Sequence, residues 1–167
     1  MKILSILLLL FSIQAQAKLD IQRWHTPEGA LVLFTQTQDL PMLDVSVIFD
    51  AASSRDGEKF GLATLTNNLL STATQHRSEE EIIQDFESVG AQFSSSSLKD
   101  MSIISLRSLT RKENLRKSLA VFTEVVTQPS FNQQYLFRER KQLLRSIKAS
   151  EQSPGSIAAL AFDEAVF

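Results

Sequence analysis

Three polar residues, Thr64, Asn67 and Asn68, have the spacing at which one face of a helix can hold a metal ion. At about 100° per residue, positions i, i+3 and i+4 project from neighbouring points of a helix surface. Two imidazoles and a carboxylate at this spacing would bind zinc and activate a bound water molecule. Thr and Asn offer only weakly basic hydroxyl and amide oxygens, so the segment has the layout of a metal site without its ligands. The leucines of the segment lie nearly opposite: Leu62, Leu65 and Leu69.

The other candidates for chemistry are isolated. His25 and His76 are far apart in the sequence, and neither has a second histidine three or four residues away. The serines of residues 94–97 lack a Gly-x-Ser-x-Gly pattern, and the chain has no cysteine nucleophile. The net charge is −2 and the basic residues are dispersed along predicted helices, so nucleic acid is not an expected partner.

The N-terminus predicts export. Lys2 precedes an apolar run at residues 3–13, which ends in Ala15-Gln16-Ala17, a small-x-small cleavage signal. Residues 1–17 are therefore predicted to be a secretory signal peptide, and no later segment is long and apolar enough to form a transmembrane segment. We expect the mature chain in the periplasm or cell envelope.

The elements that must position Thr64, Asn67 and Asn68 follow from periodicity. The chain of 167 residues is long enough for one domain, predicted over residues 18–167. Strands grouped ahead of helices predict an α+β fold, with a largely antiparallel sheet covered by helices on one face. Strands are predicted at residues 22–25, 30–37, 42–51, 91–97 and 101–108, the first two forming a hairpin; helices are predicted at 58–73, 78–90, 110–128, 132–149 and from 153 onward.

Local signals place several helix ends. Ser78 to Glu81 and Thr110 to Glu113 each have the pattern of a capping box, and Asn132 is a predicted N-cap. The sequence still has an amphipathic helical pattern at residues 162–167, without a stop signal. We therefore expect the domain to be truncated at its C-terminus.

Taken in order and approximate spacing, the sequence resembles the insulinase and pitrilysin family of zinc metallopeptidases, the mitochondrial-processing-peptidase-like inverzincins. The family's motif helix opens Gly-Leu-Ala-His-x-x-Glu-His. Here Gly61-Leu62-Ala63 is retained, while Thr64, Asn67 and Asn68 stand in place of the first His, the catalytic Glu and the second His. The resemblance places the third zinc ligand at Arg145 or Ser146, and neither is a carboxylate. Further matching segments are residues 27–32, 45–53, 74–82, 89–91, 128–131 and 153–154.

The resemblance implies a metallopeptidase-like N-terminal domain that has lost its site. Family members use zinc, but no cofactor and no catalytic or metal-binding residue is expected in this chain. Because family members often work as pairs of homologous halves or subunits, the expected partners are a zinc-bearing homologous peptidase subunit and a peptide or unfolded polypeptide. Two alternatives stay open. One is an active zinc metalloendopeptidase with unrecognised ligands, and the other is a stand-alone binding or scaffold module of the envelope.

Overall fold

The computed structural model describes residues 20–166, so the predicted signal peptide lies outside the described residues. The chain divides between Leu40 and Pro41 into two compact units. In the first unit, β1 (Ile21–His25) and β2 (Leu31–Thr35) pair as an antiparallel hairpin. The turn between them includes Gly29, whose φ of 90° is a backbone conformation that glycine adopts without strain. The predicted hairpin is confirmed.

The second unit contains a three-stranded antiparallel sheet with the order β3 (Met42–Phe49), β5 (Ser102–Leu109), β4 (Gln92–Ser97). Side chains of the central strand β5 alternate between its two faces. Ile104 and Leu106 are buried on one face. On the other face Arg107 donates to both carboxylate oxygens of Asp44 on β3, at 2.7 and 2.9 Å. The sheet therefore has one apolar face that must be covered.

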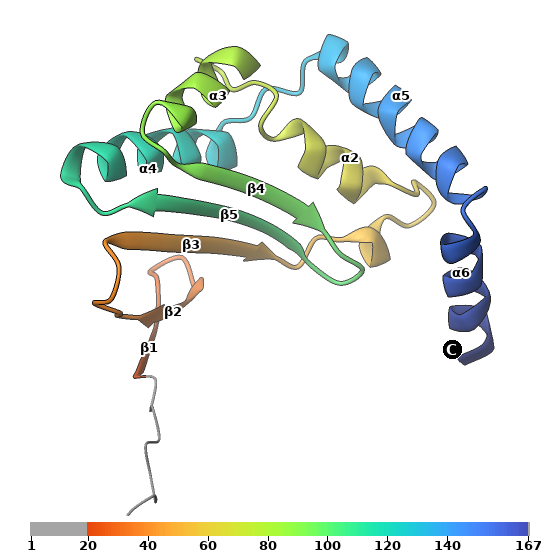
Figure 1. The fold of residues 1–167 in the computed structure, drawn as a ribbon, viewed down its shortest axis with the longest axis horizontal. Helices are drawn as coiled ribbons and strands as arrows, with labels where there is room; N and C mark the ends of the chain where they lie inside the picture. The colour runs from red at the N-terminus through yellow and green to blue at the C-terminus, as the bar shows by residue number, and fades with distance from the viewer. Residues whose placement is uncertain (1–19, 167) are drawn as a thin grey trace, which may run out of the picture. The chain divides into compact units, whose positions relative to one another are not determined.

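Three helices cover that face of the sheet: α2 (Leu62–Leu69), α3 (Glu79–Glu87) and α4 (Lys112–Thr127) (Figure 1). The helix α5 (Gln133–Ser150) packs against α2 and is followed by α6 (Pro154–Val166), and a short 3-10 helix, η1, lies at Ser53–Arg55. Val121 and Val125 of α4 pack with Ile82 and Phe86 of α3 in the core above β5. The predicted α+β fold is confirmed. Among the described helices, none is both long enough and apolar enough to cross a membrane.

Two local predictions were wrong. The motif helix is shorter than the predicted residues 58–73, because Gly57 and Gly61 adopt φ of 58° and 88° and form turns ahead of it. At the other end, residue 73 forms a β-bridge with Ser78 in place of a further helical turn. Thr110 does not cap α4: its backbone N–H donates to the Pro41 carbonyl at 2.9 Å, and the helix begins after Arg111.

Two other caps were predicted correctly. Ser78 and Glu81 form the complete capping box of α3, in which the Ser78 hydroxyl accepts from the Glu81 N–H and the Glu81 carboxylate accepts from the Ser78 N–H. At the start of α5, the Asn132 side chain accepts from the Gln134 N–H at 2.9 Å. Each of these two caps is completed by groups within three residues of one another.

Ion pairs fix the segment that connects α2 to α3. Arg77 in this segment pairs with Asp85 of α3 at 3.0 Å and with Glu124 of α4. Glu124 also accepts a hydrogen bond from the Thr74 hydroxyl. Lys117 of α4 lies 2.8 Å from Asp85. The hydrogen bonds from Lys117 and then Arg77 hold the pKa of Asp85 below its ordinary value.

These pairs predict an acid-sensitive contribution to stability. Because the folded state lowers the pKa of Asp85, its contribution is present above the unfolded pKa of about 3.9 and is lost as the pH falls through the folded pKa. We expect Asp85→Asn to lower the free energy of unfolding by about 1 kcal/mol at pH 7. The difference from wild type should shrink below about pH 4, as measured by urea unfolding. The exposed Asp100→Asn serves as a control, and a difference that stayed constant from neutral to acid would contradict the assignment.

Candidate functional site

The start of α2 is fixed by a buried carboxylate. Asp56 accepts from the backbone N–H of Gly61 at 2.8 Å and from that of Ala63 at 2.9 Å. These are N–H groups that a helix leaves without intrahelical partners, so Asp56 satisfies two of them. It also places negative charge at the positive end of the helix dipole. The position of the motif residues is therefore set from outside the helix, by a residue that sequence reasoning did not single out.

The structure divides the three motif residues between different environments. Asn68 is exposed and Thr64 is half-buried, whereas Asn67 is only 5% exposed. The helix contacts both β4 and α5, and the Asn67 carbonyl accepts from the Ser95 hydroxyl of β4 at 3.3 Å. Within the described residues, the Asn67 Nδ2 atom has no hydrogen-bond partner. The expected single polar face is therefore not uniform, because the packing of α2 turns one of its polar side chains inward.

The proposed third-ligand positions lie on α5, which packs beside α2. A Cβ added at Gly61 would lie 3.5 Å from Cδ2 of Leu143. Arg145 and Ser146 follow on the same helix and are exposed, and the Ser146 hydroxyl donates to the Leu143 carbonyl at 2.8 Å. The fold thus brings together the two helices that a zinc site of this kind would need.

The donor set on these helices does not fit zinc. A hydroxyl, two amides and either a guanidinium or a second hydroxyl provide no imidazole and no carboxylate. Among residues 20–166, no group of three His, Cys, Asp or Glu side chains could hold a metal ion. The two histidines, His25 in β1 and His76 before α3, are both exposed. Because α2 has no histidine and no carboxylate, the helix itself provides no general base for activating water.

Comparison with known proteins agrees with this geometry. The model of the insulinase family, peptidase family M16, matches residues 31–167. The chain belongs to this family. The resemblance drawn from the sequence is thus confirmed for a member that lacks His-x-x-Glu-His.

Several M16 and protease relatives are similar over most of this chain. The crystal structure of a peptidase M16 inactive domain from Pseudomonas fluorescens is 40% identical, with a TM-score of 0.83, over 86% of this chain and 35% of that one. A protease from Helicobacter pylori shares the fold, with a TM-score of 0.75 and 18% identity over 84% of this chain and 34% of that one. An uncharacterized zinc protease of Rickettsia bellii (strain RML369-C) is 23% identical over 107 residues, 64% of this chain and 26% of that protein. This chain therefore spans about a third or less of each relative.

An open hollow of about 380 Å³ lies beside α2 in this M16 chain. Its lining is mainly apolar and comes from β3, η1, α2, β5 and α4, with Asn67 among the bordering residues. Representative apolar members are Phe49, Leu62, Leu70, Ile104 and Val126. Sequence reasoning missed the hollow, because its lining is drawn from five separated elements that no single periodic pattern connects.

The other site-forming feature is the free edge of β4. This strand pairs with β5 on one side and contacts α2, and no strand pairs with its other edge in the described sheet. Its sequence, Gln92 to Ser97, has no charge and no proline, the devices by which edge strands avoid pairing with another chain. The serines at 94–97, weighed from sequence as candidates for chemistry, thus belong to an edge strand beside the motif helix.

The arrangement of α2 and α5 predicts how a zinc site could be restored. The triple variant T64H/N67E/N68H should bind zinc weakly, since it still lacks a ligand on α5. Adding either Arg145→Glu or Ser146→Glu should raise its zinc affinity at least about tenfold, in isothermal titration with zinc chloride.

The matched control for this titration is Arg140→Glu. This substitution adds a carboxylate to an exposed position of the same helix, about 140° around the axis from Arg145 and about 120° from Ser146. It should leave the zinc affinity of the triple variant unchanged. If both test substitutions bound zinc no better than this control, the assignment of the third-ligand position would be wrong.

Proposed function

We propose that this chain is a non-catalytic M16 homologue that serves as a peptide-binding or structural partner of a zinc-bearing homologous peptidase. The observation that carries the proposal is the replacement of the whole site. Asn67 is buried where the general base would stand, and the α5 positions hold Arg145 and Ser146. A single lost ligand would leave a site that one substitution could repair, whereas this site lacks every group that zinc and water activation require.

The comparison with the Pseudomonas fluorescens structure supports the non-catalytic part of the proposal. That protein is described as an inactive M16 domain, and it is 40% identical over 86% of this chain. The Rickettsia bellii relative is described as an uncharacterized zinc protease, so proteins similar to this chain include one named for the activity. A partnership between the two kinds of member would keep a catalytic site in the assembly.

The edge of β4 supports the peptide-binding part. An extended peptide can add to a free strand edge through main-chain hydrogen bonds, while pockets beside the strand select its side chains. The strand β4 contacts α2, the helix that would carry the zinc motif in a zinc-bearing homologue. A peptide bound along β4 would therefore lie next to that helix. The hydroxyl-rich, uncharged strand sequence puts no charged side chain in the way of this pairing.

The place of action that we propose is the periplasm or cell envelope. Support for it comes from residues 1–17, in which a lysine, an apolar run and the Ala15-Gln16-Ala17 signal are typical of a secretory signal peptide.

Co-purification tests the partnership. The chain is tagged in its native host and isolated under mild conditions, with a tagged envelope protein of unrelated fold as the control. We expect a homologue with an intact His-x-x-Glu-His motif to be recovered in a fixed ratio with this chain and to be absent from the control. Recovery of the chain alone would favour the stand-alone binding module. Chelator-sensitive peptide cleavage by the chain alone would favour an active peptidase with unrecognised ligands.

A further inference from the structure

The outer surface of the helical layer carries opposite charges on two of its helices. On α3 the exposed acidic residues include Glu80 and Glu87, and on α5 the exposed basic residues besides Arg138 are Arg140, Lys141, Arg145 and Lys148. Within residues 20–166, none of these six side chains takes part in an ion pair. Their charges are therefore available to a partner.

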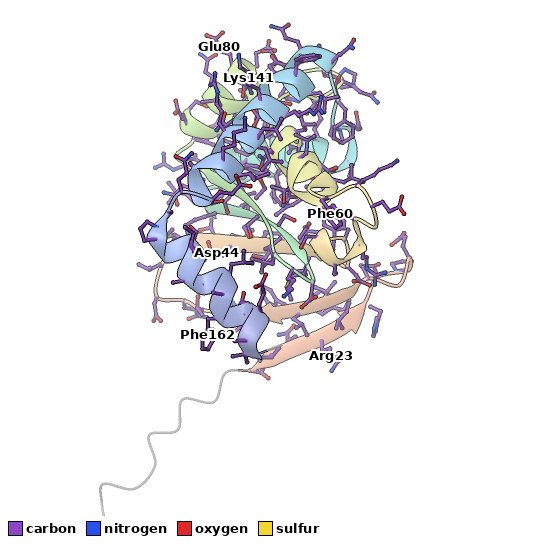
Figure 2. All side chains as sticks on the ribbon, turned by 90° about the vertical axis from the view of Figure 1, so that its right-hand side faces the viewer. Arg23, Asp44, Phe60, Glu80, Lys141 and Phe162 are labelled. Atoms are coloured by element: carbon purple, nitrogen blue, oxygen red, sulfur yellow. The ribbon has the colours of Figure 1, made fainter. Side chains whose placement is uncertain are left out.

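The two helices are joined by an ion pair near the N-terminal end of each. Arg138 of α5 donates to both carboxylate oxygens of Glu79 on α3, each at 2.6 Å, and to Glu139 at 3.0 Å. From this ion pair the helices extend apart (Figure 1). Figure 2 shows Glu80 and Lys141 near each other at the top of the view. The acidic helix and the basic helix thus adjoin, with the Arg138 to Glu79 ion pair at the boundary between them.

Large apolar side chains are exposed on the same two helices. Ile83 of α3 is 50% exposed and Phe137 of α5 is 69% exposed, and Leu144 and Ile147 of α5 are also exposed. Such residues next to free charges are typical of protein interaction sites, in which an apolar centre is surrounded by a polar rim.

We propose that this surface binds a second copy of the same chain. A twofold axis that runs between α3 and α5, in the plane of the contact, would lay α3 of each copy over α5 of the other. The contact between an acidic helix and a basic helix would then occur twice in the dimer, as an isologous interface requires. An anionic membrane would attract α5 but repel the neighbouring acidic helix, so charge complementarity favours the second copy. This self-association is separate from the proposed pairing with a zinc-bearing homologue.

Sedimentation analysis of the mature chain tests this inference. We expect a concentration-dependent dimer that weakens when salt is raised to 1 M. The variants K141E/R145E and E80K/E87K should each raise the dissociation constant at least about tenfold, because each change occurs twice in the interface. Mixing the two variants should restore a dimer, since the acidic α5 of one then faces the basic α3 of the other. Lys99→Glu, in the exposed turn between β4 and β5, makes the same change of charge as Lys141→Glu alone and should leave dimerisation unchanged.

Three results would overturn this inference. They are a monomer at all concentrations, a dimer that neither double variant weakens, and a mixture of the variants that stays monomeric while both variants keep the wild-type circular dichroism. Binding to vesicles of anionic phosphatidylglycerol without dimerisation would point instead to a membrane partner. A chain that pairs only with a zinc-bearing homologue would contradict the dimer and leave the proposed function standing.

Discussion

The packing of α4 on the central strand β5 is the contact on which the rest of the second unit depends. Val121 and Val125 are almost completely buried against Ile104 and Leu106. A three-stranded sheet cannot stand alone in water with one apolar face exposed, so this helix covers the central strand while α2 and α3 lie against β4. A buried hydrogen bond of 2.7 Å from the Ser118 hydroxyl of α4 to the Ser108 hydroxyl of β5 satisfies both polar groups inside this contact.

The helix α4 also helps to position the candidate site, through its residue Glu124. Glu124 holds Arg77 and Thr74, and these fix the segment that follows α2. Asp56 fixes the other end of the same helix. The short helix α2 is therefore clamped at both ends and lies between β4 and α5. The scaffold that would hold zinc ligands in register is preserved, although the ligand side chains have been replaced.

Much of the fold followed from the sequence because its signals are local or periodic. The capping box at Ser78 and the cap at Asn132 are complete within a few residues, and the alternation in β3 and β5 reports one buried face. Thr110 failed as a cap because the Pro41 carbonyl, distant in sequence, takes its N–H. The burial of Asn67 could not be predicted, because helical periodicity gives the relative angles of side chains but not which neighbour each face meets.

This M16 chain keeps the architecture of the family, while Thr64, Asn67 and Asn68 provide no imidazole or carboxylate on α2. The contacts that fix α2, from Asp56 at its start and from Glu124 through Arg77 and Thr74 beyond its end, do not involve these three side chains. The most direct test is elemental analysis of the purified mature chain together with a peptide-cleavage assay. The account predicts zinc far below one ion per chain and no cleavage that a chelator suppresses. One zinc ion per chain with chelator-sensitive cleavage would contradict it.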